Sequence, residues 1–157
     1  MRTPRIAILI SGTGTNMVAL MKAAITGELP AEVMVVDNDE AILKTTSMLL
    51  KALGVKPHVA RDRHESLGIL RRLGPGIGAI LLDADLGGID TLRLLDAFRL
   101  ASPKTAVVVA SGSREEDLRT MFAGRRLDGF LAKPYTLAEL KETLFAAIRA
   151  SGNAPGR

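Results

Sequence analysis

Acidic side chains stand directly after two of the apolar runs in this 157-residue chain. Asn38 lies between Asp37 and Asp39 after one run, and Asp83 and Asp85 follow another. Mg²⁺ prefers oxygen ligands and keeps several of its waters, so a couple of carboxylates suffice to hold it. A carboxylate can also act as a nucleophile toward a phosphoryl group and form an acyl phosphate. These residues therefore indicate magnesium-dependent phosphoryl chemistry.

A hydroxyl and an amine follow two further apolar runs. Ser111 ends "VVVAS" and Lys133 stands in "GFLAKPY". A transferring phosphoryl group carries spread negative charge and needs fixed donors and a hard cation more than a general base. The lysine offers a positive charge and the serine offers a hydroxyl donor. Taken separately, Ser111 is a turn former beside Gly112, and Asp37 and Asp83 are caps at strand ends.

A glycine-threonine loop, "SGTGTN", follows an earlier apolar run and precedes an amphipathic stretch. Glycines let a backbone approach an anion closely, and the N-terminus of a following helix presents free N–H groups to it. The loop is therefore a second candidate site, for phosphate or a nucleotide. Its residues are Gly12, Thr13, Gly14, Thr15 and Asn16.

Apolar runs alternate with helical periods along the whole chain. Strands are expected over residues 6–10, 33–37, 56–60, 79–83, 106–110 and 129–132, and helices over about 15–27, 40–53, 63–73, 89–101, 115–126 and 136–150. Most of the strand runs are apolar on both faces, which is typical of a parallel sheet covered on two sides. The pattern predicts a doubly wound α/β sheet, in which polar groups at the carboxyl ends of the strands share one rim.

Composition excludes several other classes of protein. The chain has no cysteine, which rules out disulfides and thiolate metal sites. No run reaches the roughly 18 apolar residues of a membrane span, so we expect a cytoplasmic protein with no membrane partner. The net charge is +4, but Lys and Arg are scattered without a long basic run. Binding to nucleic acid is therefore not expected.

From about residue 32 to residue 151, the chain resembles the receiver domain of bacterial two-component response regulators. Four motifs carry the resemblance: "VVDND", "ILLDADL", "VVVASG" and "GFLAKPY". It implies a flavodoxin-like (βα)₅ receiver with strand order 2-1-3-4-5. Residues 1–31 would then form an extra N-terminal β-α unit, and residues 152–157 a disordered tail.

The resemblance also implies a role for each residue of the candidate site. Asp83 would be the phosphoacceptor, and Ser111 and Lys133 would contact the phosphoryl group. Ser111 and Phe130 would form the switch. Mg²⁺ would be held by Asp37, Asn38, Asp83 and the backbone carbonyl of Asp85.

Two positions in this set leave alternatives open. Asn38 stands where the family usually has an acid, so we expect weaker Mg²⁺ binding, for which Asp39 could compensate. Asp39 would otherwise cap the helix that starts at Glu40. The side chain of Asp85 would tune the lifetime of the phosphoryl group, or it is a solvated loop acid. His58 and His64 are expected at the surface, without a catalytic role.

The implied function is a signalling switch rather than an enzyme. Its chemistry would be limited to accepting a phosphoryl group and losing it by self-dephosphorylation. A histidine kinase or a phosphotransfer protein would supply the phosphoryl group. With no output domain of its own, the receiver would act on a downstream protein through the face formed by residues 115–150.

The opening of the chain, about residues 5–33, is similar to the first β-α unit of glycinamide ribonucleotide formyltransferase. In that family the "SGTGTN" loop binds the phosphate of the substrate, which makes a formyltransferase-type enzyme the alternative function. The later Asn, His and Asp constellation of that family has no counterpart here. An extra apolar strand must either cover the free sheet edge beside the second receiver strand or be exchanged between chains, which would give a homodimer.

Overall fold

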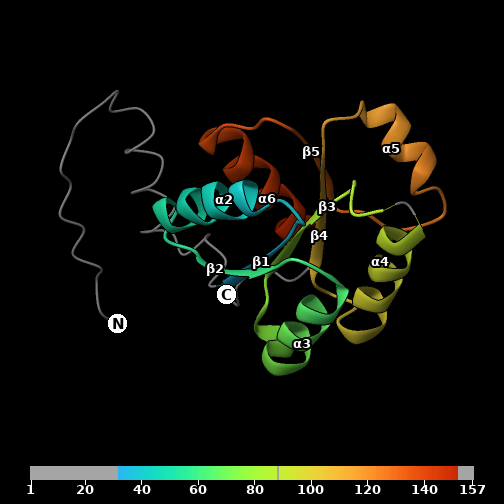
Figure 1. Ribbon diagram of the computed structural model, residues 1–157, viewed down its shortest axis with the longest axis horizontal. Coiled ribbons are helices and arrows are strands. Elements are labelled where there is room, and N and C mark those ends of the chain that lie inside the picture. Colours follow the sequence, from blue (N-terminus) through green and yellow to red (C-terminus); the bar gives the residue numbers. More distant parts are fainter. Residues whose placement is uncertain (1–31, 88, 152–157) are drawn as a thin grey trace.

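The computed structural model describes residues 32–87 and 89–151, which form one five-stranded parallel sheet with helices on both faces (Figure 1). The strand order is β2-β1-β3-β4-β5, which confirms the order predicted from the resemblance. The expected N-terminal β-α unit, the glycine-threonine loop and the expected tail lie outside the described residues. The strands are β1 (Glu32–Val36), β2 (Lys56–Ala60), β3 (Ala79–Asp83), β4 (Ala106–Ser111) and β5 (Gly129–Ala132).

Two helices cover one face of the sheet and three cover the other. The first pair packs on the core face that includes Val33 and Val35 of β1, and the other three pack on the face that includes Met34 and Val36. Every position of β3 and β4 is buried, because alternate side chains enter opposite cores. The helices are α2 (Glu40–Ala52), α3 (Arg63–Leu73), α4 (Ile89–Ala101), α5 (Glu115–Met121) and α6 (Leu137–Ser151), and a short 3-10 turn (Gly74–Gly76) follows α3.

The helix that follows β4 is shorter than the sequence predicts. We expected it over 115–126, but α5 ends at Met121. Phe122 is 2% exposed and packs into the core, and Gly124 has φ +79°. A residue in the left-handed region cannot continue a right-handed helix, so the chain turns here toward β5. The other described elements begin and end within one residue of the predicted bounds.

Local hydrogen bonds explain where α2 and α6 begin. The Asp39 carboxylate accepts hydrogen bonds from the backbone N–H groups of Ala41 and Ile42, at 2.9 and 3.4 Å. Thr136 and Glu139 form a reciprocal capping box at α6: the backbone N–H of each reaches the side chain of the other, at 2.7 and 3.2 Å. Each of these helices therefore starts a few residues after a strand ends. The residues between strand and helix are available for the site.

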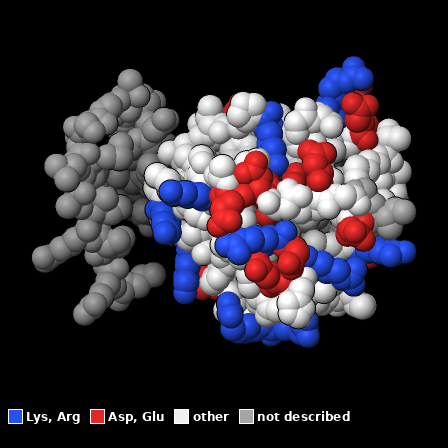
Figure 2. All heavy atoms as spheres, viewed as in Figure 1, with Lys and Arg blue, Asp and Glu red and all other residues white. Residues whose placement is uncertain are grey.

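Charged side chains of both signs are interspersed over the described part of the face seen in Figure 2, without a continuous basic stripe. This distribution agrees with the scatter of Lys and Arg in the sequence. Among the helices that the structure describes, none is both long enough and apolar enough to cross a membrane.

Candidate active site at the carboxyl edge of the sheet

Two buried carboxylates lie side by side at the carboxyl ends of β1 and β3. Val36 pairs with Leu82 in the parallel register, so the residues that follow them, Asp37 and Asp83, are neighbours. Asp37 is 2% exposed and Asp83 is 3% exposed. A carboxylate that is withdrawn from water to this degree needs charged or hydrogen-bonding partners.

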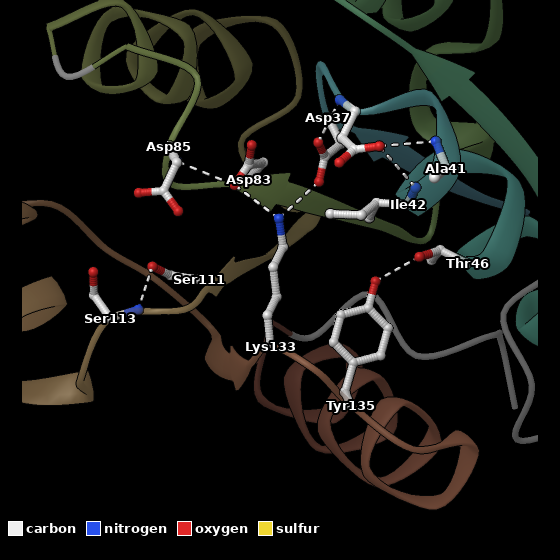
Figure 3. A network of polar contacts seen from close by, with 11 residues as sticks. Asp37, Ala41, Ile42, Thr46, Asp83, Asp85, Ser111, Ser113, Lys133 and Tyr135 are labelled. Carbon is white, nitrogen blue, oxygen red and sulfur yellow. Dashed lines mark hydrogen bonds and ion pairs between the residues drawn. The ribbon is translucent and has the colours of Figure 1, made fainter.

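Lys133, which directly follows β5, is the shared partner of these carboxylates. Its Nζ lies 2.8 Å from Asp37 Oδ2 and 3.0 Å from Asp83 Oδ1 (Figure 3). Its backbone N–H donates to the carbonyl of Ser111 on β4, at 2.8 Å. Burial lowers the pKa of Lys133, but the hydrogen bonds to Asp37 and Asp83 outweigh it, so the net pKa is raised. The ammonium therefore stays charged at neutral pH and balances the carboxylates.

The remaining contacts of the carboxylates leave one oxygen of Asp83 open. Asp37 Oδ1 accepts the backbone N–H of Asp39 at 2.8 Å, and Asp83 Oδ1 also accepts that of Asp85 at 3.1 Å. Within the part of the chain that the structure describes, Asp83 Oδ2 accepts no hydrogen bond. This oxygen keeps its lone pairs for a nucleophilic attack or a cation.

Ser111 brings a buried hydroxyl to the same rim. Asp83 pairs with Ala110, so Ser111 is the next residue on the neighbouring strand, and it is fully buried. Its Oγ accepts the backbone N–H of Ser113 at 3.0 Å. A hydroxyl that accepts one hydrogen bond still has its own proton to donate, for example to an oxygen of a phosphoryl group.

Phe130 lies one strand further along the sheet. It pairs with Val109 in the β4–β5 register and is half-buried. The Arg119 guanidinium of α5 lies 4.9 Å from the centroid of its ring, and the same guanidinium pairs with the Glu115 carboxylate. The aromatic ring therefore lies between the inner core and a charged group at the surface.

The oxygen donors at this rim fit Mg²⁺. Two carboxylates, Asp37 and Asp83, converge here, with the exposed Asn38 amide and the backbone of Asp85 next to them in sequence. These are hard oxygen ligands, and exposure on one side leaves room for water, as Mg²⁺ requires. No group of three or more acidic or histidine side chains that could hold a metal ion is found in residues 32–87 and 89–151.

The structure shows the surroundings of Asp39, which was expected as a Mg²⁺ ligand or a helix cap, and of the two histidines, which were expected at the surface. Asp39 is the N-cap of α2, and its Oδ1 is engaged by the backbone N–H groups of Ala41 and Ile42. His64 is exposed as expected. His58 is not at the surface: only 12% of its side chain is exposed, and its Nε2 lies 3.6 Å from Glu32 Oε1. Both residues of this pair belong to the sheet rather than to the rim at the strand ends.

One contact beside the site was not predicted from the sequence. The Tyr135 hydroxyl lies 2.5 Å from Thr46 Oγ1 on α2. The two residues are 89 positions apart, and only the packing of α2 beside the β5–α6 loop brings them together. A tyrosine two residues after the candidate lysine was the only available signal.

Comparison with known proteins gives one consistent family. The family model of the response regulator receiver domain matches residues 33–145. The transcriptional regulatory protein PrrA of Mycobacterium tuberculosis is 30% identical over 128 residues, which are 82% of this chain and 54% of that protein. The cell cycle transcriptional regulator CtrA of Caulobacter vibrioides is 28% identical over 122 residues, 76% of this chain and 51% of that protein. The chain thus spans about half the length of these curated relatives.

Solved structures show the same fold. A response regulator from Thermotoga maritima superposes with a TM-score of 0.68 at 26% identity, covering 77% of this chain and 99% of that one. A receiver domain from Clostridium thermocellum superposes with a TM-score of 0.69 at 22% identity, covering 78% of this chain and 97% of that one.

Proposed function

The chain belongs to the response regulator receiver family, and on that premise we propose that Asp83 accepts the phosphoryl group through which this receiver signals. The observation that carries the proposal is the environment of Asp83. Its carboxylate is buried at the end of β3, one oxygen is held by Lys133, and the other is open. An oriented carboxylate with one free oxygen is suited to nucleophilic attack.

The transfer itself is a substitution at phosphorus. Asp83 Oδ2 forms a new P–O bond while the P–N bond of a phosphohistidine donor breaks, and its electron pair stays on the imidazole nitrogen. The Lys133 ammonium and the Ser111 hydroxyl would donate to the oxygens of the transferring group, which carry its negative charge. No general base is needed, because the attacking carboxylate has no proton to lose.

Mg²⁺ would be held by Asp37, Asp83, the Asn38 amide oxygen and the backbone carbonyl of Asp85. When bound, it supplies positive charge to the phosphoryl oxygens. Asp37 orients this site through its own contacts with Lys133 and the Asp39 N–H. With one carboxylate fewer than the family pattern, affinity for Mg²⁺ depends mainly on Asp37 and Asp83.

Phosphorylation would reach a partner through Ser111 and Phe130. A hydroxyl that moves toward the new phosphoryl oxygen vacates space, and Phe130 on the neighbouring strand can enter it. This is a shift between two populated arrangements and not a new fold. The surface that responds is the α5–β5–α6 face, residues 115–150, where a downstream protein would bind.

The names of the relatives agree with a place in two-component signalling. One matching protein is the sensor kinase CckA of Brucella abortus, and PrrA and CtrA are transcriptional regulators by name. We therefore propose a histidine kinase or phosphotransfer protein as the phosphodonor, in the cytoplasm.

Labelling with a small phosphodonor tests the proposal. Acetyl phosphate with Mg²⁺ should add one acid-stable, base-labile phosphoryl group to the full chain, and chelation of Mg²⁺ should prevent it. Asp83→Asn should abolish the label, whereas the control Asp117→Asn, at an exposed acid on α5, should keep it. A label that persists in Asp83→Asn would overturn the assignment.

A further inference from the structure

The loop that carries Lys133 is fixed by hydrogen bonds at both of its ends. At one end the backbone N–H of Lys133 donates to the Ser111 carbonyl at 2.8 Å. At the other end Thr136 and Glu139 close the capping box of α6. Neither contact joins the loop to α2, which faces it across a groove.

Tyr135 supplies that link. It is half-buried between the two ends of the loop, and its hydroxyl lies 2.5 Å from Thr46 Oγ1 (Figure 3). Thr46 is 1% exposed and belongs to the regular part of α2. Burial raises the pKa of Tyr135 above its ordinary value, so the phenol stays protonated and this is a hydrogen bond between neutral groups.

A cavity beside this contact shows why the bond matters. A pocket of 360 Å³ lies between α2 and the loop, lined on one side by Ile42 and Leu49 and on the other by Lys133, Pro134 and Tyr135. The side chains of the residues that the structure describes therefore leave an open groove between helix and loop. Thr46 and Tyr135 both line this groove, so their hydroxyl pair is a direct polar link between its two walls.

We infer that Tyr135 is a positioning residue for phosphoryl transfer: its hydrogen bond to Thr46 ties the Lys133 loop to α2, so that the Lys133 ammonium stays between Asp37 and Asp83. The inference rests on the proposed function of Lys133 and Asp83 and adds a residue that touches neither reactant. The Lys133 Nζ reaches both carboxylates, at 2.8 and 3.0 Å, and a shift of the loop backbone would move the root of the side chain and lengthen these two contacts.

Three substitutions in the full chain isolate the hydrogen bond. Tyr135→Phe removes one hydroxyl and Thr46→Val removes the other at nearly constant volume, while Thr46→Ser keeps a hydroxyl in place. The matched control is Thr105→Val, which removes a buried hydroxyl that is hydrogen-bonded to the Ile77 carbonyl at the opposite edge of the sheet.

The rate of Asp83 phosphorylation by acetyl phosphate is the main readout. Tyr135→Phe and Thr46→Val should each slow it roughly tenfold, less than the hundredfold that a misplacement of about 1 Å can cost. The double variant should be no slower than either single one, because both remove the same bond. Thr46→Ser and Thr105→Val should keep the wild-type rate. Mg²⁺ affinity by calorimetry should stay unchanged throughout.

Two further readouts separate positioning from general loss of structure. Amide exchange should quicken over residues 133–136 in Tyr135→Phe and Thr46→Val, and not in Thr105→Val. The chain has a single tyrosine and no tryptophan, so intrinsic fluorescence reports Tyr135 alone and should change in Thr46→Val but not in Thr46→Ser.

The outcomes distinguish the positioning role of Tyr135 from the proposed phosphorylation of Asp83, on which it rests. If wild-type protein labels at Asp83 and Tyr135→Phe labels equally fast, the positioning role is wrong and the proposed function stands. If Thr46→Ser is as slow as Thr46→Val, or if Thr105→Val is equally slow, the effect is one of general stability and the inference falls. Failure of the wild-type protein to label overturns both.

Discussion

At the scale of single residues, the site depends on one ammonium shared by two buried carboxylates. Lys133 lies within 3.0 Å of an oxygen of both Asp37 and Asp83. Removing one partner of a buried charged group is costly, because the charge left behind has lost both water and its counter-ion. The same arrangement predicts how this part of the molecule responds to Mg²⁺ and to pH.

Replacing Lys133 by methionine should destabilise the metal-free protein by about 1–3 kcal/mol, because two buried carboxylates lose their shared donor. Added Mg²⁺ should stabilise this variant more than the wild type, since the cation then neutralises carboxylates that keep only backbone N–H donors as partners among the described residues. Urea unfolding with and without Mg²⁺ measures both effects. The matched control is Lys104→Met, at an exposed lysine. Equal stabilisation by Mg²⁺ in the two variants would contradict the shared-ammonium interpretation.

The pH dependence of the same comparison follows from the raised pKa of Lys133. A folded-state pKa above the unfolded value means that the stabilisation is fully present below the unfolded pKa of about 10.4. It is lost as the pH rises through the folded pKa. The stability difference between wild type and Lys133→Met should therefore be constant near neutrality and shrink above about pH 10.4.

A further prediction at the scale of residues concerns the contribution of Asn38 to Mg²⁺ affinity. Asn38→Asp adds a formal negative charge to the oxygen donors and should tighten Mg²⁺ binding by roughly threefold to tenfold, because ligand charge tunes the affinity of such sites. Asn38→Ala should weaken binding if the amide oxygen ligates. Calorimetry measures both. Identical affinities in all three proteins would place residue 38 outside the metal site.

At the scale of elements, the rim of the site is formed where strands end and helices begin, and neighbouring residues there have different roles. Asp39 belongs to α2, as its N-cap, and Asp37 belongs to the site, although one residue separates them. Asp39→Ala should cost about 0.5–2 kcal/mol of stability, and Asp39→Ser should recover most of it, since serine is also a good N-cap. Mg²⁺ affinity should be the same in both variants. A loss of Mg²⁺ affinity in Asp39→Ser would return Asp39 to the metal site.

The strands of this fold could be predicted from the sequence because they are short apolar runs that end in polar residues. The carboxyl ends of parallel strands meet at one rim, so the grouping of Asp37, Asp83, Ser111 and Lys133 also followed. The end of α5 did not, because the apolar period continues to Phe122 while the turn depends on the conformation of Gly124. A glycine just after the last apolar position is itself a local stop signal for a helix, and the expected bounds passed over it.

The contacts that were missed all depend on long-range packing. The hydrogen bond from Tyr135 to Thr46 needs α2 beside the β5–α6 loop, which strand order alone does not specify. The burial of His58 beside Glu32 depends on the β1–β2 register. Which oxygen of Asp83 stays open depends on where the Lys133 ammonium and the Asp85 N–H lie. Residue types and spacing predict which side chains lie at the rim. Which of these side chains form hydrogen bonds with one another depends on the packing of the elements.

At the scale of the whole molecule, the sheet links the site to a distant surface. Ser111 on β4 pairs with Ala132 on β5. Asp83, the proposed phosphoacceptor, lies on the other neighbour of β4, which is β3. The ring of Phe130 on β5 contacts Arg119 of α5. A phosphoryl group at Asp83 should therefore change the equilibrium of the segment from β4 to β5 while the β1–β2 half of the sheet stays as it is.

Amide hydrogen exchange tests this coupling. Protein phosphorylated with acetyl phosphate should show altered exchange over residues 111–135 relative to unphosphorylated protein, because Ser111 and Phe130, the proposed switch residues, lie there. Residues 56–73, which include β2 and α3, serve as the internal control and should be unchanged. Identical exchange over 111–135 in both states would count against the switch.

The most direct test of the central claim is to locate the phosphoryl group chemically. Protein labelled with acetyl phosphate and Mg²⁺ is reduced with borohydride, which converts an acyl phosphate to the corresponding alcohol, so that a phosphorylated aspartate becomes homoserine. Mass spectrometry of the peptides then reads the position. We predict homoserine at position 83 and at no other aspartate. Homoserine at 37, 39 or 85, or an unmodified chain, would contradict the account.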